Sequence, residues 1–336
     1  MNDTSPPSVS IIIPAYNAAS TISQCLDSVF KQIGPRIEVI VVDDCSSDAT
    51  REVTSKYALQ LVAMDKHRGT GAARNRGAHA ARGPVLFFMD ADVTLCEGAL
   101  ARAVADIGEP GVDAVIGSYD DDPAVRTTVS LFKNLAHHYF HQHSGSNATV
   151  FWGACGLIGR ELLFRTGGFN ENLPGITDVE LGYRLASRGA LIRLDPKLQI
   201  KHLKRWTLPL LIRTDIGIRA FPWTALIIEY GYLPKRLNFG NEQRAGALLA
   251  AALIVIGVMA LFRPAAAVPF AVCLALAAFV NRGLYRLFYR KGGVSLLIGG
   301  FLLQNLYYLY SASALVVGIA LGTLKRCSEV LKVSDD

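Results

Sequence analysis

Residues 85–92 read VLFFMDAD, an apolar run that ends in two carboxylates one residue apart. The run from Val85 to Met89 is typical of a strand that is buried on both faces of a parallel sheet. Asp90 and Asp92 follow where this strand ends, and ligands of open α/β sheets bind at the carboxyl ends of strands. Because residues i and i+2 of an extended segment point to the same side, the pair predicts a site for Mg²⁺ or Mn²⁺ with a phosphate-bearing ligand. By itself, the Asp-X-Asp pattern fits a solvated turn equally well.

Three further apolar strands precede this one, and segments with helical spacing separate them. The strands are expected at residues 9–13, 38–42 and 59–63, and the helices at 18–32, 49–57 and 70–80. Strands that alternate with helices at this spacing predict βαβ units and an α/β fold with a doubly wound, mostly parallel sheet. Later in the chain, helices are expected at residues 94–107, 125–143 and 177–187, and a strand at 112–118.

Other polar residues are expected beside the first acidic pair. Asp43 and Asp44 end the second strand, so all four carboxylates should converge on one crevice, where one pair can hydrogen-bond a base and ribose. Arg74 lies in the helix start GTGAARN, residues 69–75, from which it can reach ribose or phosphate. This segment is not a Rossmann fingerprint, because it follows the third strand and lacks a third glycine. Asp178 lies at a helix start and is a candidate general base for an attacking hydroxyl.

Charge and composition limit the classes of partner. The chain has 336 residues, enough for two domains, and 51% of them are hydrophobic. Residues 1–200 have a net charge of −4 and residues 201–336 one of +10, so the positive excess lies in and beside the most apolar part. That placement favours an anionic membrane surface over nucleic acid, and no long Lys/Arg run indicates DNA or RNA binding.

Cysteine and histidine spacing gives little sign of structural metal. The six cysteines are scattered without a C-x-x-C pair, which argues against a zinc site or a disulfide framework and fits a reducing compartment. His137 and His141 have i, i+4 spacing, but without an H-E-x-x-H signature a polar face near the substrate is the favoured interpretation. The first eight residues lack a signal-peptide pattern, so we expect the N-terminal domain, residues 1–204, to be cytoplasmic.

The C-terminal third has the pattern of a membrane region. Residues 205–243 interleave aromatic, apolar and basic side chains, which suits amphipathic helices in the membrane interface, although helices packed on the sheet would share the pattern. Uncharged segments at 245–262, 264–280 and 294–324 are candidate spans within a membrane region at 244–326, and a polar tail follows at 327–336. The third segment is long for one span, and its polar and tyrosine residues suggest that it is tilted, kinked or partly re-entrant. The basic loop 281–293 indicates its cytoplasmic side, whereas the side of the C-terminus stays open. A multi-pass protein of the inner (plasma) membrane is expected.

Six motifs in order resemble those of family 2 glycosyltransferases, and the resemblance covers about residues 9–206. They are IIIPAYN (11–17), VDDCSSD (42–48), GAARN (71–75), DAD (90–92), GGFNE (167–171) and TDVEL (177–181). The resemblance implies a GT-A fold, a UDP- or GDP-sugar donor, a divalent cation (Mg²⁺ or Mn²⁺) and inversion at the anomeric carbon.

The resemblance also implies roles for individual residues. Asp90 and Asp92 would form the DXD motif, with Asp92 the preferred metal ligand, and Asp178 would be the base. Thr177 replaces the usual first acidic residue of that pair, so Asp178 would serve alone. The nucleotide-sugar pocket would be lined by Pro14, Tyr16, Asp43, Asp44, Arg74 and Asp90.

The segment HLKRW, residues 202–206, resembles the Gln-X-X-Arg-Trp motif of processive synthases, with histidine in place of glutamine. In many non-processive relatives a histidine near this point approaches the metal and diphosphate, so His202 is a further candidate metal ligand. Trp206 would stack under an acceptor sugar or anchor in the interface, and Arg205 and Trp152 are further candidate acceptor residues.

The favoured function is a membrane-anchored inverting transferase that adds one sugar to a lipid or lipid-linked glycan acceptor. A processive polysaccharide synthase, acting as an oligomer, and a polyprenyl-phosphate sugar synthase are the alternatives. A catalytically inactive sugar-binding scaffold is a third possibility, against which the intact acidic residues argue.

Overall fold

The computed structural model describes the chain except residues 1–7, 35, 174, 232–239 and 334–336. The chain forms two compact units. The first runs to Val125 and continues from Phe140 to Arg205, and the second comprises Arg126–Tyr139 and the chain from Trp206 onward.

The first unit is built on a single mixed β-sheet with the order β3-β2-β1-β4-β8-β6-β9-β5, in which β7 also pairs with β9. Its strands are β1 (Val9–Ala15), β2 (Ile37–Asp43), β3 (Gln60–Ala63), β4 (Val85–Met89), β5 (Val93–Leu95), β6 (Ala114–Tyr119), β7 (Asn147–Ala148), β8 (Cys155–Gly159) and β9 (Ile192–His202). Strands β1 to β4 are parallel, as are β6 and β9, whereas β8 is antiparallel to both of its neighbours. The predicted α/β class and the parallel βαβ segment are therefore confirmed.

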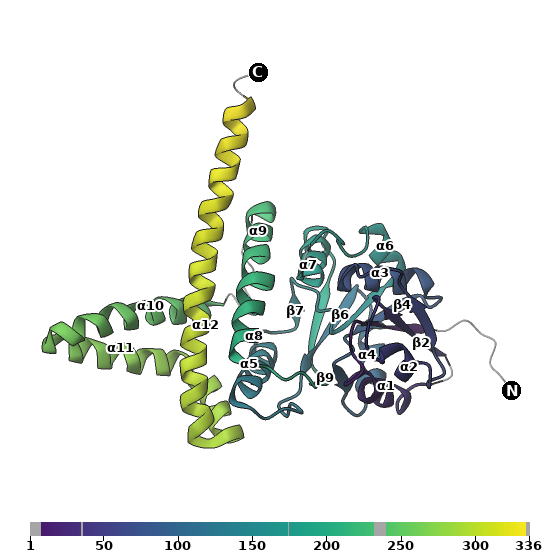
Figure 1. Cartoon of the computed structure of the whole chain (residues 1–336), viewed down its shortest axis with the longest axis horizontal. Helices are drawn as coiled ribbons and strands as arrows, with labels where there is room; N and C mark the ends of the chain where they lie inside the picture. Colours follow the sequence, from purple (N-terminus) through teal and green to yellow (C-terminus); the bar gives the residue numbers. More distant parts are fainter. Residues whose placement is uncertain (1–7, 35, 174, 232–239, 334–336) are drawn as a thin grey trace. The chain divides into compact units, whose positions relative to one another are not determined.

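Helices cover both faces of this sheet, as Figure 1 shows for α3 on one face and α1 and α4 on the other. They are α1 (Ile22–Phe30), α2 (Thr50–Thr54), α3 (Thr70–Ala80), α4 (Ala99–Ile107), α6 (Arg160–Arg165) and α7 (Thr177–Ser187). In α1, Ile22, Leu26 and Val29 are fully buried in the main core, as the helical spacing predicts. In α3, a Cβ added to Gly77 would lie 2.4 Å from Ile12, so this small residue lets the helix approach β1 closely.

The first unit differs from the sequence prediction at the start of α4 and in strands β5, β7, β8 and β9, which were not predicted. Residues 94–98, expected to be helical, form the end of β5 and a turn, because Gly98 has a φ of 72° and α4 begins only after it. Strand β9 was not predicted, because Pro196 and several charged residues mask its alternation. Its side chains nevertheless alternate between buried and partly exposed over most of its length.

The second unit is helical in its described residues. It contains α5 (Thr128–His143) up to Tyr139, α8 (Leu208–Arg213), the π-helix η1 (Thr214–Ala220), α9 (Phe221–Tyr230), α10 (Asn241–Phe262), the short 3₁₀ helix η3 (Pro264–Ala266), α11 (Ala267–Val280) and α12 (Arg282–Val333). The expected interface segment at 205–243 corresponds to α8, η1, α9 and the start of α10, and its residues 232–239 lie outside the described part. A buried ion pair joins α5 to η1, since Lys133 Nζ lies 2.6 Å from Asp215 Oδ1.

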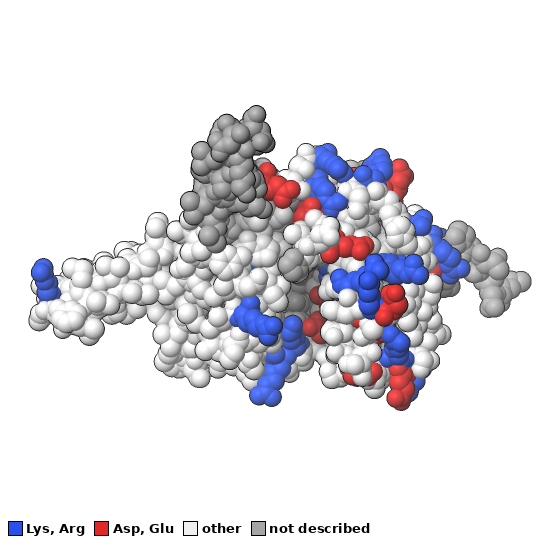
Figure 2. Space-filling view, turned by 45° about the horizontal axis from the view of Figure 1, so that its top comes forward, with Lys and Arg blue, Asp and Glu red and all other residues white. Residues whose placement is uncertain are grey.

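Two helices, Asn241–Phe262 and Arg282–Gly318, are long and apolar enough to cross a membrane, and Pro264–Val280 is a shorter apolar helix. On the face shown in Figure 2, α10 and α11 present uncharged surface apart from one basic side chain at the turn between them. Large apolar side chains are exposed there, for example Leu261 and Phe262 at 80%. Exposed apolar surface of this extent indicates a covering partner or lipid.

The expected loop at 281–293 is wrong. Arg282 to Gly292 is helical, and the break lies at Gly293, whose φ of 64° and ψ of −156° are outside the helical range. The segment is helical because its apolar residues at helical spacing, such as Leu284 and Phe288, are fully buried. The polar residues beyond Gly293 do not interrupt the helix, because they face other helices of the unit: Tyr308 donates a hydrogen bond of 2.8 Å to Asn281.

Candidate active site

The carboxyl ends of β1, β2 and β4 lie at the point where the strand order reverses around β1, which is where ligands bind in sheets of this kind. Asp43 ends β2 and pairs in register with Ala15 of β1, while Asp90 directly follows β4. The register of these buried strands therefore brings the two acidic pairs to one edge of the sheet.

Asp43 and Asp44 are both buried and both bind the protein itself. Asp43 accepts the backbone N–H of Ser46 at 3.2 Å and forms an ion pair with Arg51. Asp44 accepts the backbone N–H groups of Arg68 at 2.8 Å and of the next residue at 2.7 Å. Their first role is thus to shape the two loops that follow β2 and β3.

Tyr16 is an exposed aromatic residue at the end of β1. It is 49% exposed and stacks on His67, with the ring centroids 4.0 Å apart. The His67 Nδ1 atom lies 2.9 Å from Asp44 Oδ2, which fixes the imidazole under the tyrosine ring. The pair presents an aromatic surface suited to stacking on a planar base. Pro14 lies in β1, where it pairs in register with Val42 of β2, and it contributes to the site through its backbone conformation.

Arg74 joins α3 to the end of β4. Its Nη2 atom donates a hydrogen bond of 2.8 Å to Asp90 Oδ1, and its side chain is only 5% exposed. The guanidinium also lies 5.4 Å from the centroid of the Phe169 ring. A buried arginine held in this way presents fixed positive charge beside the acidic pair, although it is bound to Asp90 rather than projecting into solvent.

Gly153 lies between Arg74 and Asp178. A Cβ at this position would lie 2.3 Å from Arg74 Cζ, so only glycine leaves room for the guanidinium. The Gly153 N–H donates a hydrogen bond of 2.9 Å to Asp178 Oδ2. One glycine therefore accommodates the arginine and orients the candidate base. No motif in the sequence distinguishes this glycine, and its position in the small-residue stretch 153–156 was the available signal.

Asp178 lies in the first turn of α7, where the helix dipole favours a carboxylate. Its Oδ1 atom accepts the N–H of Val179 at 2.9 Å. Thr177, which stands in place of an acidic residue, is 3% exposed and faces α3: a Cβ added to Gly71 would lie 3.0 Å from its methyl group. Glu180, the other acidic residue of this turn, is bound to Arg184, so Asp178 is the acidic residue of this turn that is available to the site.

Asp92 and His202 are brought together by the pairing of β5 with β9, in which Val93 is opposite His202. The His202 Nε2 atom lies 3.8 Å from Asp92 Oδ2. The imidazole is 6% exposed and stacks on Tyr119 at 4.6 Å, so its orientation is fixed. Tyr119 is a second residue that the sequence analysis missed, because no motif distinguishes it.

The electrostatics of the site favour a bound cation. Burial raises the pKa of Asp90, and the charges of Asp92 and Asp178 raise it further, while Arg74 opposes the shift. Burial also disfavours the Asp92 carboxylate, but its hydrogen bond to His202 and the nearby charges of His202 and Lys204 hold its pKa below the usual value. Three partly exposed carboxylates that repel one another form a site that a cation stabilises.

The donor set fits Mg²⁺ or Mn²⁺. Carboxylate oxygens such as those of Asp90 and Asp92 are the ligands that Mg²⁺ and Mn²⁺ prefer, and the His202 Nε2 atom lies 3.8 Å from Asp92 Oδ2. Within the described residues no group of three or more His, Cys, Asp or Glu side chains is arranged to hold a metal. Such a site would take its remaining ligands from water and substrate phosphate, as Mg²⁺ sites commonly do.

The predicted acceptor residues do not form one group. Trp152 contacts Tyr119 edge to face at 4.9 Å and lies 5.4 Å from His141, so it adjoins His202 through Tyr119. Arg205 is exposed at the end of the first unit. Trp206 belongs to the second unit, is only 4% exposed, and its backbone N–H donates a hydrogen bond of 2.9 Å to Ser130 Oγ. Its burial leaves little ring surface on which a sugar could stack.

Comparison with known proteins defines the class. Residues 10–173 match the family model of Glycosyl transferase family 2. These residues are therefore a family 2 glycosyltransferase domain, which confirms the predicted family and its GT-A fold.

Individual relatives are similar over the same part. The chain is 37% identical over 117 residues to the succinoglycan biosynthesis protein ExoO of Rhizobium meliloti, covering 34% of each chain. It is 38% identical over 121 residues to the glycosyltransferase AglE of Haloferax volcanii, covering 34% of this chain and 40% of AglE. The matches thus span about a third to two fifths of these curated relatives.

Solved structures are similar to this chain over a larger part of its length. The mannosyltransferase PcManGT of Pyrobaculum calidifontis, solved with GDP-Man and Mn²⁺, is 25% identical and has a TM-score of 0.58 over 90% of this chain and 88% of its own. TarS of S. aureus, residues 1–349 with UDP-GlcNAc, has a TM-score of 0.52 at 22% identity over 66% of each chain, which shows a shared fold.

Proposed function

We propose that this protein is a membrane-anchored, inverting glycosyltransferase that moves one sugar from a nucleotide-diphosphate sugar to a lipid or lipid-linked acceptor at the cytoplasmic face. One observation carries the proposal: Asp90, Asp92 and Asp178 converge with Arg74 and His202 at the carboxyl ends of the parallel strands. The family 2 domain over residues 10–173 supports the reaction class.

In the proposed reaction Asp178 is the general base. Its carboxylate, oriented by the N–H groups of Gly153 and Val179, takes the proton from an acceptor hydroxyl as the hydroxyl oxygen attacks the anomeric carbon. The bond from that carbon to the diphosphate oxygen breaks, and its electron pair leaves with the diphosphate. A single displacement inverts the configuration.

Asp92 and His202 would hold a divalent ion, which supplies positive charge that neutralises the departing diphosphate. Arg74 would act differently, because its guanidinium is committed to Asp90 and holds that carboxylate in place. The Tyr16–His67 stack would receive the base of the nucleotide. A UDP- or GDP-sugar is the proposed donor, and the GDP-Man and Mn²⁺ in PcManGT support the GDP form and a divalent ion.

The proposed acceptor is lipidic because two helices of the second unit are long and apolar enough to span a bilayer. A hydroxyl or phosphate borne by a membrane lipid would then be available at the surface where the chain is anchored. The four arginine and lysine residues between positions 282 and 291 support a cytoplasmic position for this segment.

The experiment is sugar transfer from labelled UDP- and GDP-sugars to a membrane lipid extract, with purified full-length protein and Mn²⁺. We expect a lipid-soluble product carrying one sugar, and loss of about 10²- to 10⁴-fold of the rate in Asp178→Asn, the usual range for a general base. Glu97→Gln, an exposed change in the same unit, is the matched control.

Full activity in Asp178→Asn would refute the assignment of the base. A ladder of products on a gel would refute single transfer and favour the processive alternative. Binding of nucleotide-sugar without transfer to any lipid fraction would favour a sugar-binding role.

A further inference from the structure

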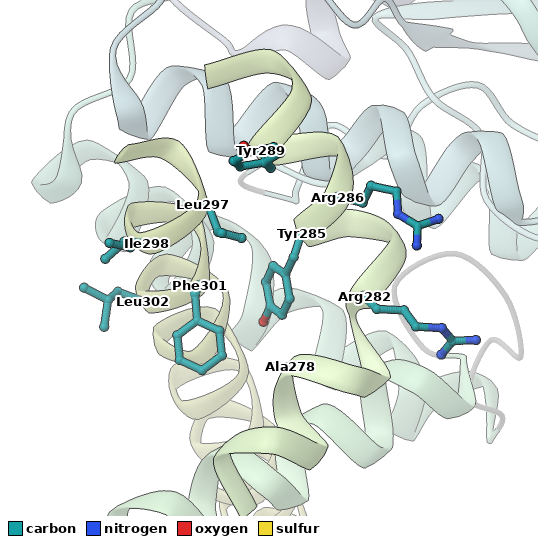
Figure 3. A pocket seen from close by; sticks show the side chains of 9 residues that line it. All are labelled: Ala278, Arg282, Tyr285, Arg286, Tyr289, Leu297, Ile298, Phe301 and Leu302. Carbon is teal, nitrogen blue, oxygen red and sulfur yellow. The ribbon is translucent and has the colours of Figure 1, made fainter. Parts of the chain in front are cut away.

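The second unit contains a helical hairpin beside an open groove, seen from close by in Figure 3. The hairpin bends at Gly293, so that the start of α12 packs back on the segment after the bend. The Phe288 ring occupies the space beside Gly300, where a Cβ would lie 2.4 Å from it. The Tyr285 and Phe301 rings are 5.4 Å apart between centroids. Phe288 thus meets residue 300, and Tyr285, earlier in the chain, meets residue 301, so the two segments run antiparallel.

The groove is apolar and has the size of a ligand site. Its volume is about 530 Å³, within the usual range for small-molecule pockets. The apolar wall consists of Ala278, Leu297, Ile298, Phe301 and Leu302. Ile298 and Leu302 are 57% and 63% exposed, so the chain itself does not cover this wall. A hydrocarbon chain is the kind of ligand that such a wall binds.

Two arginines border the groove. Arg282 and Arg286, one helical turn apart, are both among its lining residues. In Figure 3 their guanidinium groups extend to the same side, away from the apolar wall, so that the aliphatic stems adjoin the groove and the charges lie at its rim. This arrangement suits a ligand with an apolar chain and an anionic head.

The charges at the rim lack a carboxylate partner in the described part of the chain. No Asp or Glu occurs between residues 243 and 328. Arg282 donates a hydrogen bond of 3.2 Å to the carbonyl oxygen of Phe279 and lies over its ring at 4.4 Å; among the described residues it forms no ion pair, and Glu242 is the acidic residue in its neighbourhood, since both charges act on Tyr139. An anion at the rim would provide the missing counter-charge.

A buried hydroxyl gives a second, independent sign of a ligand. Tyr285 lines the groove and is 6% exposed, and its hydroxyl makes no hydrogen bond within 3.5 Å to a described residue, with the Asn305 side chain beside it. Buried polar groups are nearly always hydrogen-bonded, and leaving one unpaired costs free energy. A ligand oxygen in the groove would accept this hydrogen bond.

We propose that the groove binds one anionic phospholipid of the bilayer. One hydrocarbon chain lies along Leu297, Ile298 and Leu302, the phosphate lies at Arg282 and Arg286, and an ester or phosphate oxygen accepts from Tyr285. The inference rests on the membrane location within the proposed function but not on sugar transfer, since every group that it uses belongs to the second unit.

Native mass spectrometry of the full chain in detergent tests this, with phosphatidylglycerol and phosphatidylcholine of identical acyl chains titrated separately. We expect a one-to-one adduct with phosphatidylglycerol at a concentration at least about tenfold lower than with phosphatidylcholine. The double variant Arg282→Gln/Arg286→Gln should lose this preference. Arg263→Gln/Arg290→Gln removes the same charge from exposed positions that do not line the groove, and should keep it.

A second variant tests the apolar half of the site. Ala278→Trp fills the groove without removing a charge, and we expect it to weaken adducts with both lipids. Equal binding of the two lipids by the unchanged protein, or an equal effect of the two double variants, would overturn the proposal. Because lipid is titrated directly, the result is independent of whether the enzyme assay succeeds.

Discussion

At the scale of single residues, the candidate site depends on side chains that are held in place before any ligand binds. Asp90 is fixed by Arg74, Asp178 by two backbone N–H groups, and His202 by the ring of Tyr119. Preorganised groups of this kind stabilise developing charge without a reorganisation cost during the reaction. The residue that links two of them, Gly153, carries no reactive group.

Asp92 should govern the response to metal. We expect chelation with EDTA to abolish transfer and Mn²⁺ or Mg²⁺ to restore it. Asp92→Asn should raise the Mn²⁺ concentration for half-maximal rate at least about tenfold, because removing groups that merely support metal ligands already costs 10- to 100-fold. The measurement is initial rate against free Mn²⁺, with Glu97→Gln as the control. An unchanged Mn²⁺ requirement in Asp92→Asn would place the metal elsewhere.

Asp106 should make stability depend on pH. Burial, and then the neighbouring Asp195 carboxylate, raise the pKa of Asp106 to about 6, although Arg102 and Arg193 oppose the shift. A carboxyl group whose pKa is raised by folding stabilises the fold when protonated. This contribution is complete below the unfolded pKa of about 4 and is lost as the pH rises through 6.

Asp106→Asn therefore should be more stable than the unchanged protein at pH 8, and the difference should shrink towards pH 5. Thermal melting followed by circular dichroism in detergent measures it, with Glu97→Gln as a variant expected to differ little at either pH. A stability difference that is independent of pH would contradict the assigned pKa.

At the scale of elements, α7 is positioned by a glycine as well as by its buried apolar side chains, Leu181, Tyr183 and Leu185. A Cβ at Gly182 would lie 2.0 Å from the backbone nitrogen of Phe151 and 2.4 Å from the carbonyl carbon of Val150. The helix therefore lies directly against the segment that leads to Gly153, the donor to Asp178. The placement of the candidate base is thus a consequence of how closely one helix approaches one loop.

Gly182→Ala should displace α7 and reduce both stability and transfer. We expect a loss of at least about 1–3 kcal/mol, the usual range for overpacking, because the atoms that clash are backbone atoms. Gly159→Ala is the matched control, since its Cβ meets nothing within 4 Å. Chemical denaturation and the transfer assay measure the two effects. If both variants behaved alike, close packing at Gly182 would not determine the position of α7.

At the scale of the whole molecule, the chain combines a family 2 domain of mixed charge with a helical unit in which apolar residues are widely exposed. In the second unit, polar side chains meet between packed helices. Lys133 Nζ and the Tyr310 hydroxyl both donate hydrogen bonds to the Asp215 carboxylate, at 2.6 and 2.7 Å. Buried charges paired in this way suit a unit whose exterior faces an apolar medium.

The second unit should hold the protein in a membrane. We expect the full chain to remain in the membrane pellet after extraction with alkaline carbonate and to be released by detergent. Immunoblotting of pellet and supernatant measures this, with a peripheral protein of the same membrane as the control. Release by carbonate alone would show surface association only and would refute the spanning helices.

Much of the molecule follows from its sequence alone. The apolar runs before Asp43 and Asp90 predicted the parallel strands, because a strand that is buried on both faces consists almost entirely of apolar residues. The same logic placed the two acidic pairs at one edge of the sheet. Periodicity also identified α1 and α3, and absence of charge identified α10, α11 and the part of α12 after Gly293, whereas the start of α12 was expected to be a loop.

Only the tertiary structure decided which residues meet across long separations. Asp92 lies beside His202 through the pairing of β5 with β9, and Arg74 reaches Asp90 through the space left at Gly153. The helical hairpin at Gly293 and the groove beside it also could not be predicted from the sequence, because a basic segment between two apolar segments predicts a loop. Periodicity records which face of an element is buried, whereas the partner it is buried against depends on strand order, register and small residues that carry no pattern of their own.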